Sequence, residues 1–171
     1  KTLRSCAQAP RSCRPSRSPH HQTLHSRFLV MQTFLPYPDF IMSAACLDNK
    51  RLGKQRVEAR QIYNCLKGPN GWRNHPAVKM WKGYTTAIAQ YHDTIIAEWT
   101  KRGYRNSMPY LCESFTVIEY FMDEKSPPWL GNLDFHASHR SNLLRKDPIW
   151  YGQFGWAEPD NLPYIWPGEN A

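Results

Sequence analysis

Residues 74–103 read NHPAVKMWKGYTTAIAQYHDTIIAEWTKRG, and this stretch decides the fold class. Its apolar side chains recur at three- and four-residue steps, at Ala77, Trp81, Tyr84, Ile88, Tyr91, Ile95 and Trp99. That spacing places them on one face of a helix. We expect Asn74 to cap this helix, Pro76 to lie in its first turn and Gly103 to end it. Such a helix would be about 39 Å long, at about 1.5 Å per residue, and would form the centre of a small helical domain.

The rest of the chain also shows helical signals. We expect a short turn capped by Asp39, a helix from Asp48 to about Lys67, a helix over 112–122, and a helix capped by Asp134 that continues to Lys146. No useful stretch alternates between polar and apolar residues, and no repeat is visible. The sequence therefore predicts an all-α fold, a compact single-domain helical bundle around one long central helix with an aromatic C-terminal tail.

Residues 1–30 differ in composition from the remainder. They hold six bases and no acid, whereas residues 31–171 hold 16 bases against 14 acids, a net charge of +2 within the formal +8 of the chain. Ser, Pro, Arg and His dominate the first segment without periodicity, so we expect a disordered or non-native N-terminal extension, although an organellar transit peptide has a similar composition. We expect one domain over residues 31–171, with its first patterned segment at Met31.

Composition excludes several classes of protein. No run of 18 apolar residues occurs, so we expect no membrane partner. Five cysteines, none in a CxxC pair, favour neither a disulfide scaffold nor a zinc ribbon. We expect Cys46, Cys65 and Cys112 to be reduced core thiols in a cytoplasmic protein.

A single acid stands among five bases in residues 48–61, which read DNKRLGKQRVEARQ. The acid is Glu58, and the bases are Lys50, Arg51, Lys54, Arg56 and Arg60. At helical spacing, Arg51, Lys54 and Glu58 share one face. Surplus positive charge around one acid suits a polyanion and leaves the acid available for chemistry. The alternative is a solvated, salt-bridged helix surface.

A second group of polar residues lies on the helix that ends at Lys146. It comprises His136, His139, Arg140, Arg145 and Lys146. These side chains suit phosphate contacts. Two other interpretations remain open. The histidines could be structural, or His136 and His139 could share a metal, which would need further ligands such as Glu58 or His75.

Two further segments could contact nucleic acid. Residues 150–156 read WYGQFGW, in which Trp150, Tyr151 and Phe154 could stack on bases or could simply close a core. Arg73 precedes the long helix, where it and backbone donors could hold a phosphate or form an ordinary capped loop.

Three segments resemble, in the same order, a known enzyme family. They are Leu47 to Ile62, the helix end Lys101-Arg102-Gly103-Tyr104-Arg105, and the closing Pro148-x-Trp150-Tyr151-x-x-Phe154-Gly155. They are similar to the phage-type pyrimidine-dimer DNA glycosylases with AP-lyase activity, the endonuclease V type. The likeness covers most of residues 39–156. Its most specific parts are Leu47, Arg51 and Leu52 ahead of Glu58, and the Lys-Arg-Gly-aromatic stop.

The resemblance implies a compact all-helical enzyme that binds damaged double-stranded DNA as a monomer, flips a base and cuts a glycosidic bond without a cofactor or metal. Glu58 matches the catalytic glutamate of the family, and Arg51 matches a histidine position in the DNA-contacting helix. The aromatic tail matches one implicated in lesion binding. The arginines around the glutamate align loosely, since position 57 is Val between Arg56 and Glu58.

The family's nucleophile is the α-amine of a small residue that follows the initiator Met, and it forms an imine with C1′ of the sugar. Here Gln32, a large residue, follows Met31. We therefore expect Lys54 or Lys50 to replace the terminal amine, with Lys54 as the candidate catalytic residue, because neighbouring bases lower a lysine pKa. Two alternatives to this enzyme are a non-catalytic nucleic-acid-binding module that uses the same basic face and a metal-dependent hydrolase built on His136 and His139.

Overall fold

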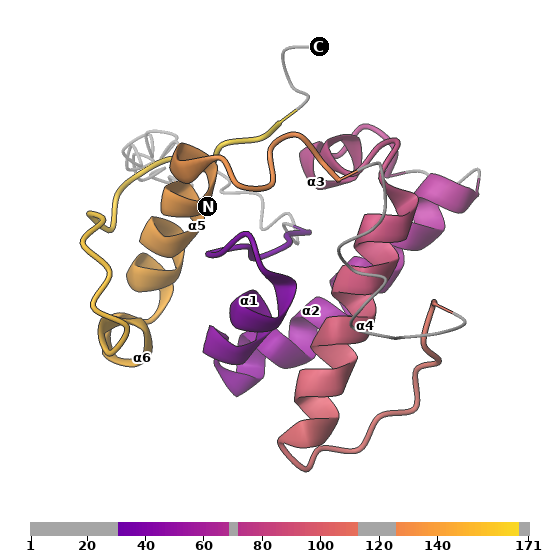
Figure 1. The fold of residues 1–171 in the computed structure, drawn as a ribbon, viewed down its shortest axis with the longest axis horizontal. Coiled ribbons are helices and arrows are strands. Elements are labelled where there is room, and N and C mark those ends of the chain that lie inside the picture. The colour runs from indigo at the N-terminus through magenta and orange to yellow at the C-terminus, as the bar shows by residue number, and fades with distance from the viewer. Residues whose placement is uncertain (1–30, 69–71, 113–125, 168–171) are drawn as a thin grey trace, which may run out of the picture. The chain divides into compact units, whose positions relative to one another are not determined.

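The computed structural model describes residues 31–68, 72–112 and 126–167. Its elements are helices α1 (Phe40–Cys46), α2 (Asn49–Lys67), α3 (Pro76–Met80), α4 (Thr85–Lys101), α5 (Leu133–Lys146) and α6 (Pro148–Gly152) (Figure 1). No strand occurs in these ranges. The all-α prediction is confirmed. The expected N-terminal extension over 1–30 lies outside the described residues, as does the expected helix over 112–122 apart from its first residue.

The predicted long helix is wrong as one element, because α3 and α4 are separated by a turn at residues 81–84. Gly83 has a φ of +89°, a left-handed conformation that side chains disfavour and that ends α3. Trp81 is nevertheless fully buried, so the apolar period continues across the break. The cap of α3 is also different from the prediction. His75, not Asn74, accepts the N–H of Ala77, at 3.2 Å.

The other helix ends follow local rules. Asp39 accepts the N–H of Met42 at 2.8 Å, and Asp48 accepts that of Arg51 at 3.0 Å, as predicted. Gly103 follows α4 with a φ of +84°, also as predicted. The cap of α5 was predicted wrongly, since Asn132 caps it and Asp134 lies inside its first turn.

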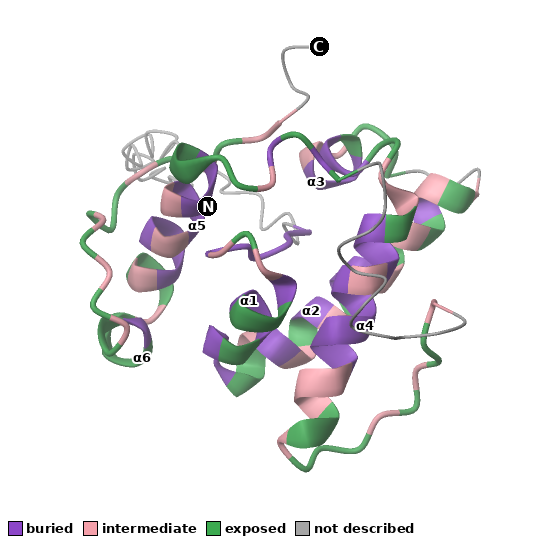
Figure 2. Cartoon of the chain, viewed as in Figure 1, coloured by how far each residue is buried: buried purple, intermediate pink, exposed green. Residues whose placement is uncertain are grey.

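Helices α2 and α4 pack along each other and form the centre of the domain (Figure 1). Their buried residues face one another (Figure 2), with Leu52, Ala59 and Ile62 of α2 fully buried. Gly53 permits a close approach, because a Cβ placed there would stand 3.0 Å from the Trp99 ring of α4. A larger residue at position 53 would therefore push the two helices apart.

Arg102, just after α4, joins three helices. Its guanidinium donates to the carbonyl oxygens of Leu47 at 2.7 Å and Ala45 at 2.9 Å, which are left unpaired at the end of α1. It also donates to Asn49 Oδ1 at 3.0 Å and to Glu98 Oε1 at 2.8 Å. Arg102, in the basic segment at the end of α4, therefore has a structural role.

The segment 31–35 has no regular secondary structure and is buried throughout. The Trp81 indole donates to Thr33 Oγ1 at 3.2 Å, and Tyr91 OH donates to the Phe34 carbonyl at 3.0 Å. His136 of α5 contacts the Leu35 carbonyl at 2.8 Å. This buried segment therefore connects α4 to α5 and also borders α2.

Two further expectations concern thiols and membranes. Cys46 and Cys65 are buried and unbridged, as predicted, and burial raises the pKa of Cys46 to about 12. Cys112 is half-buried rather than in the core. None of the helices in the described ranges is long and apolar enough to cross a membrane.

Candidate active site

Glu58 lies on α2 and is only 5% exposed. Three groups hold its carboxylate. Gln55 Nε2 donates to Oε2 at 2.7 Å, the Gln32 backbone N–H donates to the carboxylate, and Lys54 Nζ lies 3.1 Å from Oε1. The solvated-surface interpretation is therefore wrong for Glu58, although it describes Lys54, whose side chain is half exposed. The pair therefore joins one half-exposed cation to one buried acid.

The environment raises the pKa of Glu58 above its ordinary value of 4.5. Burial is the main cause, because removal from water disfavours the charged form. The Lys54 charge and the hydrogen bonds from Gln32 and Gln55 act in the opposite direction. The carboxylate would interact strongly with a charge that develops near it, because the buried surroundings screen this interaction less than water does.

Gln55 orients Glu58 and was not singled out from the sequence. It is completely buried, and its Oε1 accepts the Phe34 N–H at 3.2 Å and Tyr91 OH at 2.8 Å. Its Nε2 donates to the Gln32 carbonyl at 2.7 Å as well as to Glu58. The available signal was a neutral amide three residues before a glutamate, on the side of the helix that also carries Leu52.

Arg51 and Tyr151 form a fixed pair at the start of α2. Arg51 Nη1 lies 2.5 Å from Asp48 Oδ2, and Tyr151 OH donates to the same oxygen at 2.7 Å. The Arg51 guanidinium stands 5.4 Å from the centre of the Tyr151 ring. Arg51 also approaches Asp147 at 3.8 Å. These contacts tie Asp147, at the junction of α5 and α6, and Tyr151 of α6 to the start of α2.

Lys146, the last residue of α5, is exposed, and its charge interacts with the charges of Arg51, Lys54 and Glu58. Partial removal from water lowers its pKa, and the like charges of Arg51, Arg145 and Lys54 lower it further. Glu58 acts in the opposite direction. We call Arg51, Lys54, Glu58 and Lys146 the α2–α5 cluster.

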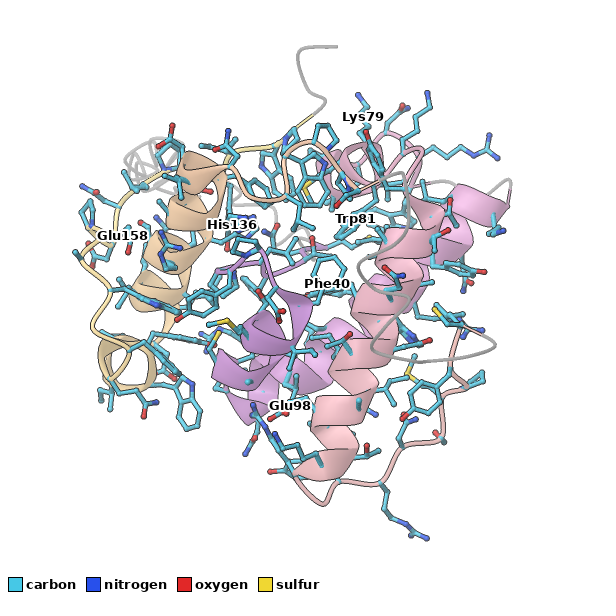
Figure 3. The ribbon with its side chains drawn as sticks, viewed as in Figure 1. Phe40, Lys79, Trp81, Glu98, His136 and Glu158 are labelled. Carbon is cyan, nitrogen blue, oxygen red and sulfur yellow. The ribbon has the colours of Figure 1, made fainter. Side chains whose placement is uncertain are left out.

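The structure corrects the prediction for the two histidines. His136 and His139 are each 1% exposed, and His136 lies on the inner side of α5 (Figure 3). His136 Nδ1 donates to the Leu35 carbonyl at 2.8 Å, and its Nε2 accepts the Gly131 N–H at 2.9 Å. His139 Nδ1 accepts the Leu35 N–H at 3.4 Å. Both rings therefore serve the backbone, and neither faces a phosphate.

The metal interpretation has no support from these histidines. Because both ring nitrogens of His136 are engaged with backbone groups, it has no lone pair left for a cation. Among residues 31–68, 72–112 and 126–167, no group of three or more His, Cys, Asp or Glu side chains is arranged to hold a metal ion.

Two predicted phosphate contacts are occupied by protein groups. Arg140 donates to Glu158 Oε1 at 2.6 and 2.8 Å and to the Pro36 carbonyl at 2.7 Å. It therefore ties α5 to the C-terminal segment, on which Glu158 lies (Figure 3). The Arg56 guanidinium stands 4.1 Å from the centre of a Trp99 ring and donates to Asn106. Both are structural arginines.

Three other predicted contacts remain nearer the solvent. Arg60 is half-buried and donates to the Pro109 carbonyl at 3.4 Å, and Arg73 is exposed and donates to the Gly68 carbonyl at 2.6 Å. Arg145 is exposed and contacts Asn142.

The aromatic tail mainly closes the core. Tyr151 is fully buried, and Phe154 stacks on Trp156 with ring centres 5.2 Å apart. The base-stacking prediction is thus wrong for Tyr151, whose faces are covered. Trp150 is the more open ring, at 37% exposure, and its indole donates to the Cys46 carbonyl at 2.9 Å.

Comparison with known proteins matches the segment that carries Glu58 and Lys54. The family model described as pyrimidine dimer DNA glycosylase matches residues 31–111. No curated protein and no solved structure matches the chain. The matched segment includes the buried residues 31–35, α2 with Glu58, and α4. Residues 31–111, slightly less than half of the chain, are therefore similar to the pyrimidine dimer DNA glycosylase family.

Proposed function

We propose that this protein is a DNA repair enzyme that cuts the N-glycosidic bond of a pyrimidine dimer and then nicks the strand as an AP lyase through an imine. The observation that carries the proposal is the buried Glu58 carboxylate, held by Gln55 and by the Gln32 backbone inside the family-matched segment. Bases around this acid attract DNA, while the acid faces the sugar.

Glu58 has the properties that glycosidic cleavage requires. When the C1′–N bond breaks, positive charge develops on the sugar, and a carboxylate close to it stabilises that charge. A buried carboxylate held by fixed donors does this better than a hydrated one, because it needs little reorganisation during the reaction. The bond between Gln55 and Glu58 supplies this fixed geometry.

The lyase step needs an amine that reaches C1′. The Gln32 nitrogen lies at the carboxylate, but as a peptide nitrogen it lacks a nucleophilic lone pair because of amide resonance. The side-chain amines available in the α2–α5 cluster are those of Lys54 and Lys146. Lys54 Nζ, our expectation from the sequence, lies 3.1 Å from Glu58 Oε1, which supports it as the amine for a C1′ atom bound beside the acid.

We also propose that the open basic groups of the described residues contact the DNA backbone. The exposed or half-buried candidates are Lys54, Arg60, Arg73, Arg145 and Lys146, and the partly open ring is Trp150. Arg51 contributes a positive charge at the rim while it holds Asp48. Phosphate contacts of this kind position a duplex without reading its sequence.

The experiment is a nicking assay of the full chain on irradiated duplex DNA and on duplex DNA with one abasic site, in excess EDTA. We expect strand cleavage of both substrates and a covalent protein–DNA adduct when borohydride is added, because borohydride reduces an imine to a stable amine. Binding without cleavage or adduct would leave a non-catalytic DNA-binding module as the function. Cleavage abolished by EDTA would point instead to a metal-dependent hydrolase.

A further inference from the structure

Tyr91 of α4 lies at the far end of a hydrogen-bond chain that reaches Glu58. Its side chain is completely buried, and its hydroxyl lies 2.8 Å from Gln55 Oε1 and 3.0 Å from the Phe34 carbonyl oxygen. Both oxygens only accept hydrogen bonds, so the single proton of the hydroxyl is shared between them. On the other side of the same amide, Gln55 Nε2 donates to Glu58 Oε2 at 2.7 Å. One side chain therefore connects Tyr91 to the acid.

The amide of Gln55 can take two orientations of nearly equal shape, in which its oxygen and its nitrogen exchange places. In the observed orientation, Oε1 faces two donors, the Phe34 N–H at 3.2 Å and Tyr91 OH. Nε2 faces two acceptors, Glu58 Oε2 and the Gln32 carbonyl oxygen. The exchanged orientation would bring the amide oxygen against both acceptors, which repel it. The donors on Oε1 thus hold the orientation that supplies Glu58 with an N–H group.

The Tyr91 hydroxyl remains a donor at neutral pH. Burial raises the pKa of Tyr91 well above its ordinary value of 10, and the charge of Glu58 raises it further. Tyr91→Phe would remove this donor and keep the ring, which packs against Phe40 and Trp81 with ring centres 5.4 and 6.0 Å away. The change therefore isolates the hydroxyl from the packing of the side chain.

We propose that Tyr91 is a positioning residue for glycosidic cleavage, an inference that rests on the proposed function. Tyr91 is completely buried and acts through Gln55, because its hydroxyl fixes the amide and the amide fixes the Glu58 carboxylate. A carboxylate must be ionised to stabilise positive charge at C1′. The donor that Tyr91 holds in place favours this ionised form and so keeps the acid reactive toward lower pH.

Other ionisable groups also interact with Glu58. They are Lys54 on its own helix, Lys146 on α5 and Tyr164 in the C-terminal segment. Within the described part of the chain, the amide of Gln55 bonds to none of these three groups. Tyr91→Phe leaves all three in place, so a change in the protonation of Glu58 would report on the amide.

The first test measures this protonation in the folded full chain, without DNA. Protein labelled with ¹³C at the glutamate carboxyl carbon is titrated by NMR, and the Glu58 signal is the one that Glu58→Gln removes. We expect a higher pKa of Glu58 in Tyr91→Phe than in the parent, because an ionised carboxylate without a fixed donor is less stable. An unchanged pKa would overturn the inference, whether or not the protein is active.

The parent gives a second measurement that needs no substitution at Tyr91. The ring carbon that carries the Tyr91 hydroxyl should change its chemical shift at the pKa of Glu58, since the amide couples the two groups. A Tyr91 signal that does not respond to this titration would contradict the coupling.

Thr33→Val is the matched control. Thr33 is fully buried in the segment 31–35, and its Oγ1 accepts the Trp81 indole N–H at 3.2 Å. This change also removes one buried hydroxyl, but the hydroxyl does not bond to the Gln55 amide. We expect lower stability with an unchanged pKa of Glu58. An equal rise of that pKa in both variants would mean that loosening of the segment, and not the amide, is the cause, which would overturn the inference.

The second test measures strand cleavage. In Tyr91→Phe at pH 7 we expect the maximal rate to fall by up to roughly 10²-fold, the cost of misplacing a reacting group by about 1 Å, with KM within a few-fold of the parent. The acid limb of the pH–rate profile should move to higher pH, and in Thr33→Val it should stay in place. An active parent with an equally active Tyr91→Phe would contradict the positioning role alone. A parent that does not cleave would remove the proposed function, and the positioning role with it.

Discussion

Gln55 Nε2 lies 2.7 Å from Glu58 Oε2 and donates to it. The two residues are three apart on α2, so the helix itself sets their spacing. The same nitrogen lies 2.7 Å from the Gln32 carbonyl oxygen, which belongs to the buried segment 31–35. A single amide therefore joins the acid to the segment that crosses the centre of the domain.

The first prediction concerns this amide. Gln55→Met keeps the length of the side chain but removes its polar atoms, which leaves the buried Phe34 N–H and Gln32 carbonyl without these partners. We expect the free energy of unfolding to fall by about 2–4 kcal/mol, because each buried group left without a partner costs about 1–3 kcal/mol. Urea denaturation measures it. Gln61→Met, at an exposed position of the same helix, should change it by less than about 0.5 kcal/mol.

The second prediction concerns His139, whose pKa burial lowers from 6.5 to about 3. The unfolded chain binds a proton at this residue between these values and the folded chain does not. Stability therefore rises with pH in that window and is lost as the pH falls below about 6.5. We expect His139 to contribute a slope of at most about 1.4 kcal/mol per pH unit. Urea titrations at successive pH values measure the slope.

His139→Gln separates this effect from other groups. Glutamine can still accept the Leu35 N–H but does not titrate in this range, so the slope should decrease even if the variant is less stable overall. His136, whose pKa burial also lowers, should maintain the remaining slope. An unchanged slope would show that burial does not lower the pKa of His139.

The fold could be predicted where local signals and burial agree. Asp39, Asp48 and Gly103 act as expected because caps and left-handed stops depend on a few neighbouring residues. The break at Gly83 escaped prediction for a physical reason. Trp81 remains buried on the same side of the domain as α4, so the three- and four-residue period continues through a turn that is not helical.

The third prediction tests the close approach of α2 to α4. In Gly53→Ala the new methyl group would meet the Trp99 ring at 3.0 Å. The ring cannot easily shift, because it stacks on Tyr104 with centres 4.2 Å apart and its indole donates to the Arg105 carbonyl. Overpacking costs about 1–3 kcal/mol, which exceeds the gain of about 1 kcal/mol in helix propensity. We expect a lower thermal midpoint.

Gly152→Ala is the matched control for Gly53. Nothing lies within 4 Å of a Cβ built at Gly152, which also sits in a helix, so this change should be neutral or slightly stabilising. A midpoint that rises equally in both variants would mean that Trp99 adjusts at no cost.

The candidate site could be predicted only in part, since sequence spacing shows which residues share a helix face but not what covers that face. Glu58 and Lys54 are paired as their i,i+4 spacing suggests. The same reasoning placed His136 and Arg140 on a phosphate-binding surface, whereas the segments around Leu35 and Glu158 cover them. Those partners lie 101 and 18 residues away along the chain, beyond the reach of periodicity.

The last prediction concerns Glu58→Gln, which removes the charge with little change in shape. If the carboxylate stabilises charge at C1′, strand cleavage should fall by roughly 10²-fold or more. DNA affinity should stay within a few-fold, because the change removes a negative charge near phosphates. Nicking of irradiated and abasic duplex, with affinity measured on the same sample, gives both values. Unchanged nicking would end the catalytic role of Glu58.

Stability at pH 7 distinguishes this role from a structural one. The folded state raises the pKa of Glu58, so the stabilising contribution of this group is present below its unfolded pKa and is lost as the pH rises through the folded pKa. The ionised carboxylate at pH 7 is thus a cost of folding that exceeds the benefit of its contact with Lys54. A neutral glutamine removes that cost, and we expect an unfolding free energy equal to or above that of the parent. A structural salt bridge predicts a loss of stability with nicking preserved, which is the opposite combination.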